Sequence, residues 1–269
     1  ATHEQKKWWY GQMMEGVITA FCLTEPGAGS DAAGLSTRCV KDGDDYILNG
    51  TKQFISNGGV AGLYTVFATL DKKMGHKGIC CFMVDRNTPG ISVSKPENKM
   101  GIRSSNTTQV IFEDVRVPAR NLLGKEGDGF KIAMKTLDIS RAVVAAMAVG
   151  IAQGAFECAV QYAKERQQFG KPIASFQAIQ FILAEMSVMV ETARLLYQKA
   201  ANNQDMGLPY TREASLAKYW AGEAAMKVSL NAVQVHGGYG YTKEYMVEKY
   251  MRDAKIFQIF EGTAEVQRL

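Results

Sequence analysis

The closing stretch AKIFQIFEGTAEVQRL sets one carboxylate, Glu261, after the apolar Ile259 and Phe260 and before Gly262 and Thr263. A carboxylate among apolar side chains has its pKa raised from about 4.3, so it can accept a proton near neutrality. A glutamate at the start of a helix is an equally good interpretation, because the helix dipole favours negative charge there. The hexapeptide FEGTAE alone leaves both readings open.

Two glycine-rich segments could approach a ligand closely. TEPGAGSD (residues 24–31) follows an apolar run, and QVHGGYGY (residues 234–241) follows a helical pattern. Glycine has no Cβ, so backbone N–H groups in such loops can reach a bound molecule. Neither segment matches a dinucleotide or nucleotide-triphosphate motif, and each could equally be a surface turn or a helix end.

Two charged positions in the helical part have local explanations. Asp138 and Arg141 are three residues apart, which predicts an ion pair on one helix face. Arg166 lies near a predicted helix end at Gly170, where a basic residue compensates the helix dipole. A role for either arginine in binding requires an acidic or phosphorylated ligand.

The composition describes an ordinary globular protein. The 269 residues are 46% hydrophobic and 22% charged, and the net charge of +4 is not concentrated in any basic run, which disfavours nucleic acid and anionic membranes as partners. The five cysteines show no metal or disulfide spacing, which predicts a reducing compartment and no metal site. No segment is expected to supply the roughly 20 apolar residues of a membrane span, and no signal peptide is expected.

The chain changes texture near residues 120–128. Short apolar runs between turn signals predict an antiparallel β domain over residues 19–125, with a hairpin whose type I′ turn is formed by Asn49 and Gly50. Ala, Met, Leu and Lys at helical spacing then predict long helices to the end of the chain. The expected fold class is α+β, with a barrel-like β domain followed by a helical bundle.

Six segments in order resemble the flavin-dependent acyl-CoA dehydrogenase family, especially its short-chain, butyryl-CoA type. They are FCLTEPGAGSD, FISNGG, RSSNTTQVIFEDVRVP, ERQQFGKPI, QVHGGYGY and RDAKIFQIFEGTAEVQRL. The resemblance implies that residues 1–18 end an N-terminal helical domain, residues 19–125 form the middle β domain and residues 126–269 form a C-terminal four-helix bundle. Both ends are expected to be truncated relative to the family, because the chain starts without Met and stops at Leu269.

The resemblance implies FAD as the cofactor, lying between the β domain and the helical domain. In the family, Thr24 and Ser56 match hydrogen-bonding positions at the flavin ring, and Phe54 stands where relatives often have Trp. The adenine and pyrophosphate end is completed by the neighbouring subunit, which implies a homo-oligomer, usually a dimer of dimers. The positions that match FAD contacts are Phe21, Leu23, Thr24, Gly29, Ser30, Phe54, Ile55, Ser56, Arg166, Phe169, Gln177, Gln234, Gly237, Gly238, Thr263 and Glu265.

The same resemblance assigns the substrate site. Ser30, Asp138, Arg141 and Gly262 match contacts to the CoA thioester, and Glu261 matches the base that removes the α-proton while the flavin takes hydride from Cβ. A second subgroup carries its base just before the arginine that matches Arg141. That position is Ser140 here, so the chain resembles the subgroup with Glu261 as base.

The expected activity is dehydrogenation of a short- or medium-chain acyl-CoA to trans-2-enoyl-CoA, with an electron-transferring flavoprotein as acceptor. The alternative is an enoyl-CoA reductase of the crotonyl or acrylyl type running the reaction in reverse within an electron-transferring-flavoprotein complex. An acyl-CoA oxidase shares the same motifs, so reactivity with oxygen stays open, whereas Glu261, Arg141 and the modest charge disfavour a non-catalytic flavin-binding relative. The expected location is the bacterial cytoplasm or the mitochondrial matrix, and acyl chain length and direction stay open.

Overall fold

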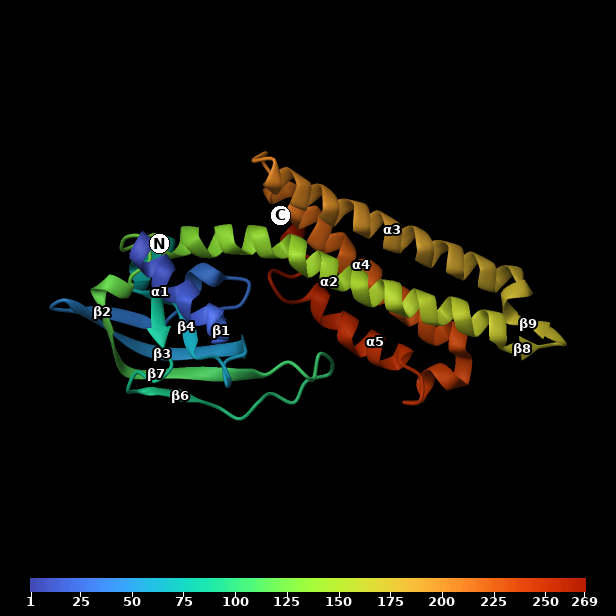
Figure 1. Ribbon diagram of the computed structural model, residues 1–269, viewed down its shortest axis with the longest axis horizontal. Helices are drawn as coiled ribbons and strands as arrows, with labels where there is room; N and C mark the ends of the chain where they lie inside the picture. The colour runs from blue at the N-terminus through green and yellow to red at the C-terminus, as the bar shows by residue number, and fades with distance from the viewer. The chain divides into compact units, whose positions relative to one another are not determined.

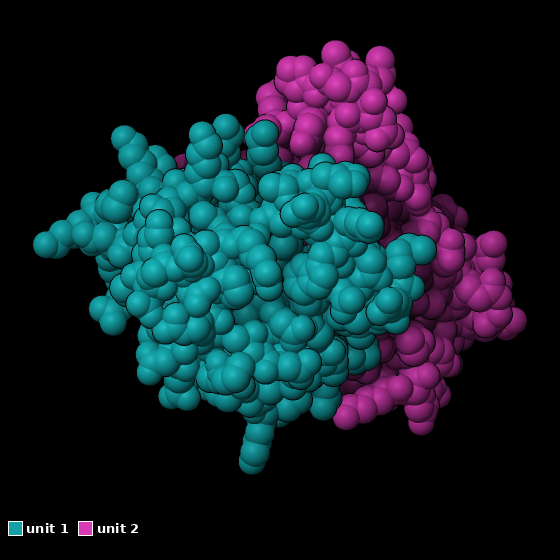
Figure 2. All heavy atoms as spheres, turned by 60° about the vertical axis from the view of Figure 1, so that its left-hand side comes forward, with its two compact units in different colours: residues 1–99, 103–135 teal, residues 100–102, 136–269 magenta.

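The computed structural model describes residues 1–269 and holds five α-helices, nine strands and seven short 3-10 helices (Figure 1). The chain divides into two compact units, residues 1–99 with 103–135 and residues 100–102 with 136–269, coloured separately in Figure 2. The helices are α1 (His3–Met14), α2 (Gly129–Glu165), α3 (Gln177–Asp205), α4 (Thr211–His236) and α5 (Val247–Ala254). The strands are β1 (Thr19–Cys22), β2 (Arg38–Asp42), β3 (Asp45–Ser56), β4 (Leu63–Thr69), β5 (Ile79–Asp85), β6 (Ile91–Val93), β7 (Thr107–Pro118), β8 (Gln167–Gln168) and β9 (Lys171–Pro172).

The first unit is built on one seven-stranded sheet. Its order is β1-β4-β2-β3-β7-β6, with β5 paired to β4. The expected β domain is confirmed, and most of its pairs are antiparallel, although β1 runs parallel to β4 over four residues. Alternating apolar residues of these strands form a continuous buried core that includes Leu48, Tyr64 and Phe112.

The predicted hairpin at Asn49 and Gly50 is wrong. Strand β3 continues through both residues, and its pairing with β7 shifts register there. Gly50 is required because the chain passes close to Thr37: a Cβ on Gly50 would lie 2.5 Å from the Thr37 Oγ1. The tight turn lies instead between β2 and β3, where Gly43 has the left-handed φ of 62° that such turns need.

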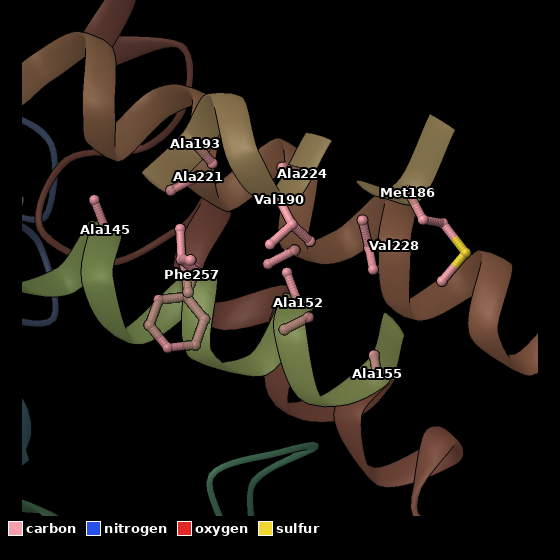
Figure 3. Close-up of a cluster of buried hydrophobic side chains, with 14 of the residues drawn as sticks. Ala145, Ala152, Ala155, Met186, Val190, Ala193, Ala221, Ala224, Val228 and Phe257 are labelled. Carbon is pink, nitrogen blue, oxygen red and sulfur yellow. The ribbon is translucent and has the colours of Figure 1, made fainter. Parts of the chain in front are cut away.

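The second unit is a bundle of the three long helices α2, α3 and α4 with the short α5, as expected. Small residues at helical spacing line the facing sides, so the helix backbones approach closely and exclude water. Figure 3 shows Ala152 of α2, Val190 of α3 and Ala224 of α4 gathered in one part of this cluster. This alanine-rich packing fixes the positions of the helices along one another, and with them the positions of the polar side chains that they carry.

The expectation that no segment is apolar enough to span a membrane is wrong for α2. An 18-residue window of this helix has a mean hydropathy of 1.8. Its Ala, Val and Met side chains supply that hydropathy, and 39% of the window is buried within the protein. Apolar core helices pass this test as readily as membrane-spanning ones, so length and composition do not distinguish the two.

Candidate active site

Glu261 occupies a strained turn at the end of the bundle. Its φ is 55° and that of Gly262 is 91°, two left-handed residues in succession. A non-glycine residue there costs free energy and is typical of functional positions. Glu261 therefore does not start an α-helix: residues 264–265 form a turn, and a 3-10 turn, Val266–Arg268, follows.

The Glu261 carboxylate is enclosed within the second unit. Ser140 of α2 donates its hydroxyl to the Glu261 Oε2 at 2.5 Å. Burial raises the pKa of Glu261, while the Ser140 hydrogen bond and the positive charges of Lys218 and Arg141 oppose the rise without cancelling it. A carboxylate with a raised pKa and a defined orientation is suited to accept a proton near neutral pH.

The predicted Asp138–Arg141 pair lies beside this carboxylate. The Arg141 Nη1 is 2.9 Å from the Asp138 Oδ1, and Asp138 also accepts a hydrogen bond from the Thr211 hydroxyl at 2.9 Å. The Arg141 Nε is 3.5 Å from the backbone carbonyl of Glu261. The structure therefore places Asp138, Arg141, Glu261 and Gly262 close together.

Lys218 of α4 was missed by the sequence analysis. Only 1% of its surface is exposed, and its ammonium donates a hydrogen bond to the Gly262 carbonyl. Burial lowers the pKa of Lys218 to about 8, with Glu261 acting in the opposite direction. The available signal was a lysine four residues after Ala214 and three before Ala221, on the stripe of α4 that faces the core.

Backbone donors at the turn are free. The N–H groups of Glu261, Gly262 and Thr263 donate no hydrogen bond within the protein, whereas that of Ala264 bonds the Gln258 carbonyl at 2.9 Å. Unpaired N–H groups next to a carboxylate can bind an oxygen that gains negative charge. The turn thus combines a proton acceptor with donors for an oxyanion.

In the first unit, β3 presents Phe54 to solvent. The β3–β7 register shifts between Lys52 and Ile55, and Phe54 has a φ of 56° with 63% of its surface exposed. This bulge turns an aromatic side chain outward that regular alternation would have placed differently. The Gln53 N–H donates to the Thr24 carbonyl at 2.8 Å, which joins the glycine-rich loop to the bulge.

The predicted flavin-ring residues of this unit differ in what they offer. The hydroxyls of Thr24, Ser30 and Ser56 make no hydrogen bond within the protein, and a Cβ on Gly29 would meet open space. The buried side chains of Leu23 and Ile55 can offer a ligand only their backbone groups. The Phe21 ring packs on that of Phe67 at 4.9 Å.

A buried ion pair that the sequence analysis did not identify anchors the loop. The Lys52 Nζ is 2.7 Å from the Glu25 Oε1 and 3.1 Å from the Leu23 carbonyl. Glu25 also accepts hydrogen bonds from the backbone N–H groups of Ser36 and Thr37. Burial works to raise the pKa of Glu25, but Lys52 and these donors together bring it down to about 2.

The remaining predicted cofactor residues gather where α2 ends, α3 begins and α4 ends. Arg166, Gly237 and Gly238 line a surface hollow of about 540 Å³, and Gln177 and Gln234 lie in the adjoining helix ends. Phe169 forms the turn of the β8–β9 hairpin and is 93% exposed. Arg166 has no acidic partner and lies over the Tyr239 ring at 5.4 Å, so its charge is available to an anion.

This hollow and the Glu261 turn are distant within one chain. Lys218, which contacts the turn, and His236, which lines the hollow, are 18 residues apart on α4, a span of about 27 Å. Thr263 and Glu265 lie with the Glu261 turn, and the Thr263 hydroxyl accepts the Val266 N–H at 3.3 Å. The predicted cofactor residues of this unit therefore form two separate groups.

The chain matches two family descriptions over most of its length. The middle domain of acyl-CoA dehydrogenase matches residues 20–115, and the C-terminal domain of acyl-CoA dehydrogenase matches residues 127–269. The short-chain specific acyl-CoA dehydrogenase of Clostridium acetobutylicum is 51% identical over 269 residues, which are 100% of this chain and 71% of that protein. The acryloyl-CoA reductase (NADH) of Anaerotignum propionicum is 49% identical over 271 residues, covering 100% of this chain and 69% of that protein.

Solved structures agree with these matches. The butyryl-CoA dehydrogenase of Megasphaera elsdenii superimposes with a TM-score of 0.97 at 52% identity, over 99% of this chain and 70% of that one. A chain from a study of the electron transferring flavoprotein of Acidaminococcus fermentans and flavin-based electron bifurcation gives the same values. The fold and these relatives define a flavoprotein oxidoreductase that acts on CH–CH groups. The chain belongs to the acyl-CoA dehydrogenase family.

Proposed function

We propose that the protein dehydrogenates a short- or medium-chain acyl-CoA to the trans-2-enoyl-CoA, with FAD as cofactor and Glu261 as the base. The observation that carries this proposal is the half-buried Glu261 carboxylate on a left-handed turn, bonded to the Ser140 hydroxyl and adjacent to free backbone N–H groups. Relatives named as short-chain and butyryl-CoA dehydrogenases support the substrate class.

The α-hydrogen of a thioester is only weakly acidic, so its removal needs a positioned base and stabilisation of the negative charge on the thioester oxygen. Glu261 takes the proton at its carboxylate, and burial raises its pKa, which favours the protonated form. The free Glu261 N–H is the donor that the chain offers to the oxygen. Base and oxyanion donor then belong to one residue, which couples their positions.

Arg141 and Asp138 are proposed to border the bound thioester together with Gly262, and Ser30 is proposed to contact it from the first unit. Arg141 binds one carboxylate oxygen of Asp138 and the Thr211 hydroxyl binds the other, so the Asp138–Arg141 pair is held in place without a ligand. Gly262 permits close approach of the substrate to the turn because it has no side chain.

The residues fit FAD. In the first unit, free hydroxyls at Thr24, Ser30 and Ser56, open space at Gly29 and the exposed Phe54 ring offer polar and stacking contacts. In the second unit, Arg166 and the open Gly237–Gly238 backbone offer contacts for a pyrophosphate, with Phe169, Gln177 and Gln234 nearby. When bound, FAD supplies the acceptor for the hydride that leaves Cβ.

We propose a homo-oligomer in the arrangement of a dimer of dimers, and the two separate groups in the second unit support the participation of a second copy. The Arg166 hollow is about 27 Å from the Glu261 turn along α4, so one chain does not present both groups to one place. We propose that the hollow serves the cofactor whose flavin end is bound by a second copy. Residues Thr263 and Glu265 belong to the other group, beside the base.

The relatives bear on the direction of the reaction, and the cysteines bear on the compartment of the protein. The matches to an acryloyl-CoA reductase and to a chain studied with an electron transferring flavoprotein support such a flavoprotein as electron partner, and they favour enoyl-CoA reduction as the second candidate activity. All five cysteines are unpaired and four are buried, which supports a reducing compartment such as a bacterial cytoplasm or a mitochondrial matrix.

The test is an anaerobic titration of the full-length, FAD-loaded protein with acyl-CoAs from C4 to C16, following bleaching of the flavin absorbance. The proposal predicts stoichiometric bleaching with the shorter chains. Retained flavin colour with every chain length would refute it. Bleached enzyme that is reoxidised by crotonyl-CoA at a higher rate than it is reduced by butyryl-CoA would favour the reductase direction.

A further inference from the structure

The face of α4 that packs into the bundle carries a buried lysine, Lys218, in the N-terminal third of the helix. The residues at and around this position are Ala214, Ala217, Ala221, Ala224 and Ala225, all buried. Lys218 lies among them with 1% of its surface exposed and with no carboxylate within ion-pair distance. Burying an ammonium group is expensive, so the fold must gain something from the charge at this place.

The one acceptor of the Lys218 ammonium is the Gly262 carbonyl, 44 residues away in sequence. Gln267 supports the same turn, since its Nε2 lies 3.2 Å from the Glu261 carbonyl and 3.1 Å from the Gly262 carbonyl. Both carbonyls of the left-handed pair are thus held from the inside of the bundle. The strained dihedrals of Glu261 persist because these donors over-determine them.

The charge of Lys218 also faces the carboxylate. Helix α2 places Ser140 and Arg141 next to the turn, and Asp138 is paired with Arg141. Helix α4 places Lys218 there, with Glu223 further along the helix. Glu265 lies on the turn itself. Among these groups only Lys218 and Arg141 place positive charge against Glu261. Arg141 is already neutralised by Asp138, whereas Lys218 has no such partner.

We propose that Lys218 is a positioning residue for the base: its ammonium holds the left-handed Glu261–Gly262 turn through the Gly262 carbonyl and supplies the positive charge that faces the half-buried carboxylate. This inference rests on the proposed function of Glu261. It assigns two separable tasks to one side chain, the fixing of backbone geometry and the stabilisation of the ionised base.

Three variants of the full-length, FAD-loaded enzyme separate these tasks. Lys218→Met removes donor and charge, Lys218→Gln keeps a donor without charge, and Lys218→Arg keeps the charge. Lys227→Met is the matched control, because Lys227 is an exposed lysine on the same helix. In Lys218→Met we expect kcat to fall about tenfold with KM nearly unchanged, and the acid limb of the kcat/KM profile to move up by about one pH unit.

Lys218→Gln is expected to move the acid limb as far as Lys218→Met does while keeping more of kcat, and Lys218→Arg is expected to leave the limb in place. An acid limb that is unchanged in Lys218→Met would overturn the inference while leaving Glu261 as base. Wild-type flavin that no acyl-CoA bleaches would instead refute the proposed function, and a second measurement then decides on Lys218.

That measurement is the melting temperature between pH 5 and pH 7. The folded-state pKa of Glu261 is raised, so its protonation adds stability that is complete below the unfolded pKa and is lost as the pH rises through the folded pKa. Removing Lys218 raises that pKa further. Lys218→Met should therefore lose more melting temperature across this window than wild type, and Glu261→Gln in both backgrounds should abolish the difference. Equal losses in Lys218→Met and wild type would overturn the inference.

Discussion

The two units each bury a lysine, and the two lysines are treated differently. Lys52 of the first unit is fully buried and pairs with Glu25 at 2.7 Å, while Glu25 is further bonded by backbone donors. Lys218 of the second unit is buried as deeply but binds only a backbone carbonyl. The neutral Lys52–Glu25 pair fixes the glycine-rich loop. The unpaired charge of Lys218 instead acts to lower the pKa of the neighbouring Glu261 carboxylate. The comparison separates a structural charge from one that acts on the site.

The largest stability effect is expected at Lys52. Lys52→Met leaves Glu25 buried without its cation, and breaking a buried ion pair in this way costs about 3–5 kcal/mol. Urea unfolding followed by circular dichroism measures the loss, and Lys41→Met on the exposed side of β2 should leave the midpoint unchanged. A matching change of the partner, Lys52→Met with Glu25→Leu, should recover part of the loss. Wild-type stability in Lys52→Met would contradict a structural role for the Lys52–Glu25 ion pair.

Gly262→Ala tests the left-handed turn that Lys218 holds. Gly262 has a φ of 91°, which a side chain disfavours, and an added Cβ would lie 2.3 Å from the Gln267 Nε2, so the Gln267 side chain must move away from the Glu261 and Gly262 carbonyls. Strain of about 1–2 kcal/mol at such a φ corresponds to about a tenfold loss of turnover if it displaces the base. Gly150→Ala is the control, since a Cβ there meets nothing within 4 Å in the helix α2. Unchanged turnover in Gly262→Ala would contradict a geometric role for the turn.

Ser140→Ala tests the hydrogen bond that stabilises the ionised base. The Ser140 hydroxyl bonds the Glu261 carboxylate and opposes the rise of its pKa. Without it the acid limb of kcat/KM should move up by about one pH unit, while turnover well above the limb stays within about threefold. Stopped-flow flavin reduction across pH 5–9 measures this, with Ser187→Ala on α3 as control. An acid limb that moves to lower pH would show that the Ser140 hydroxyl does not stabilise the ionised form of Glu261.

Periodicity predicted the parts of the fold that depend on local pattern. The run of small apolar residues after residue 128 gave long helices, because one face of each must be buried, and those helices form. Asn49 and Gly50 carried a strong turn signal, yet they lie within β3. Gly50 is needed because a side chain at this position would clash with Thr37, a neighbour in the sheet that no local sequence pattern reveals.

The site shows the same division. Glu261 could be singled out from its sequence neighbours, but the local pattern did not distinguish a base from a helix start, and the structure has a turn there. Lys218 and Ser140 reach Glu261 and Gly262 only through the packing of α2 and α4, across more than 40 residues of chain. Contacts of that range depend on tertiary packing, so spacing alone could not supply them.

The most direct test of the account is the rate of flavin reduction by butyryl-CoA in Glu261→Gln of the full-length, FAD-loaded enzyme. The substitution keeps the size of the side chain and removes its basicity, while Glu244→Gln, at an exposed position in the same unit, controls for the chemical change alone. The account predicts a loss of about two or more orders of magnitude with FAD content unchanged. Flavin reduction in Glu261→Gln at a rate near that of wild type would contradict it.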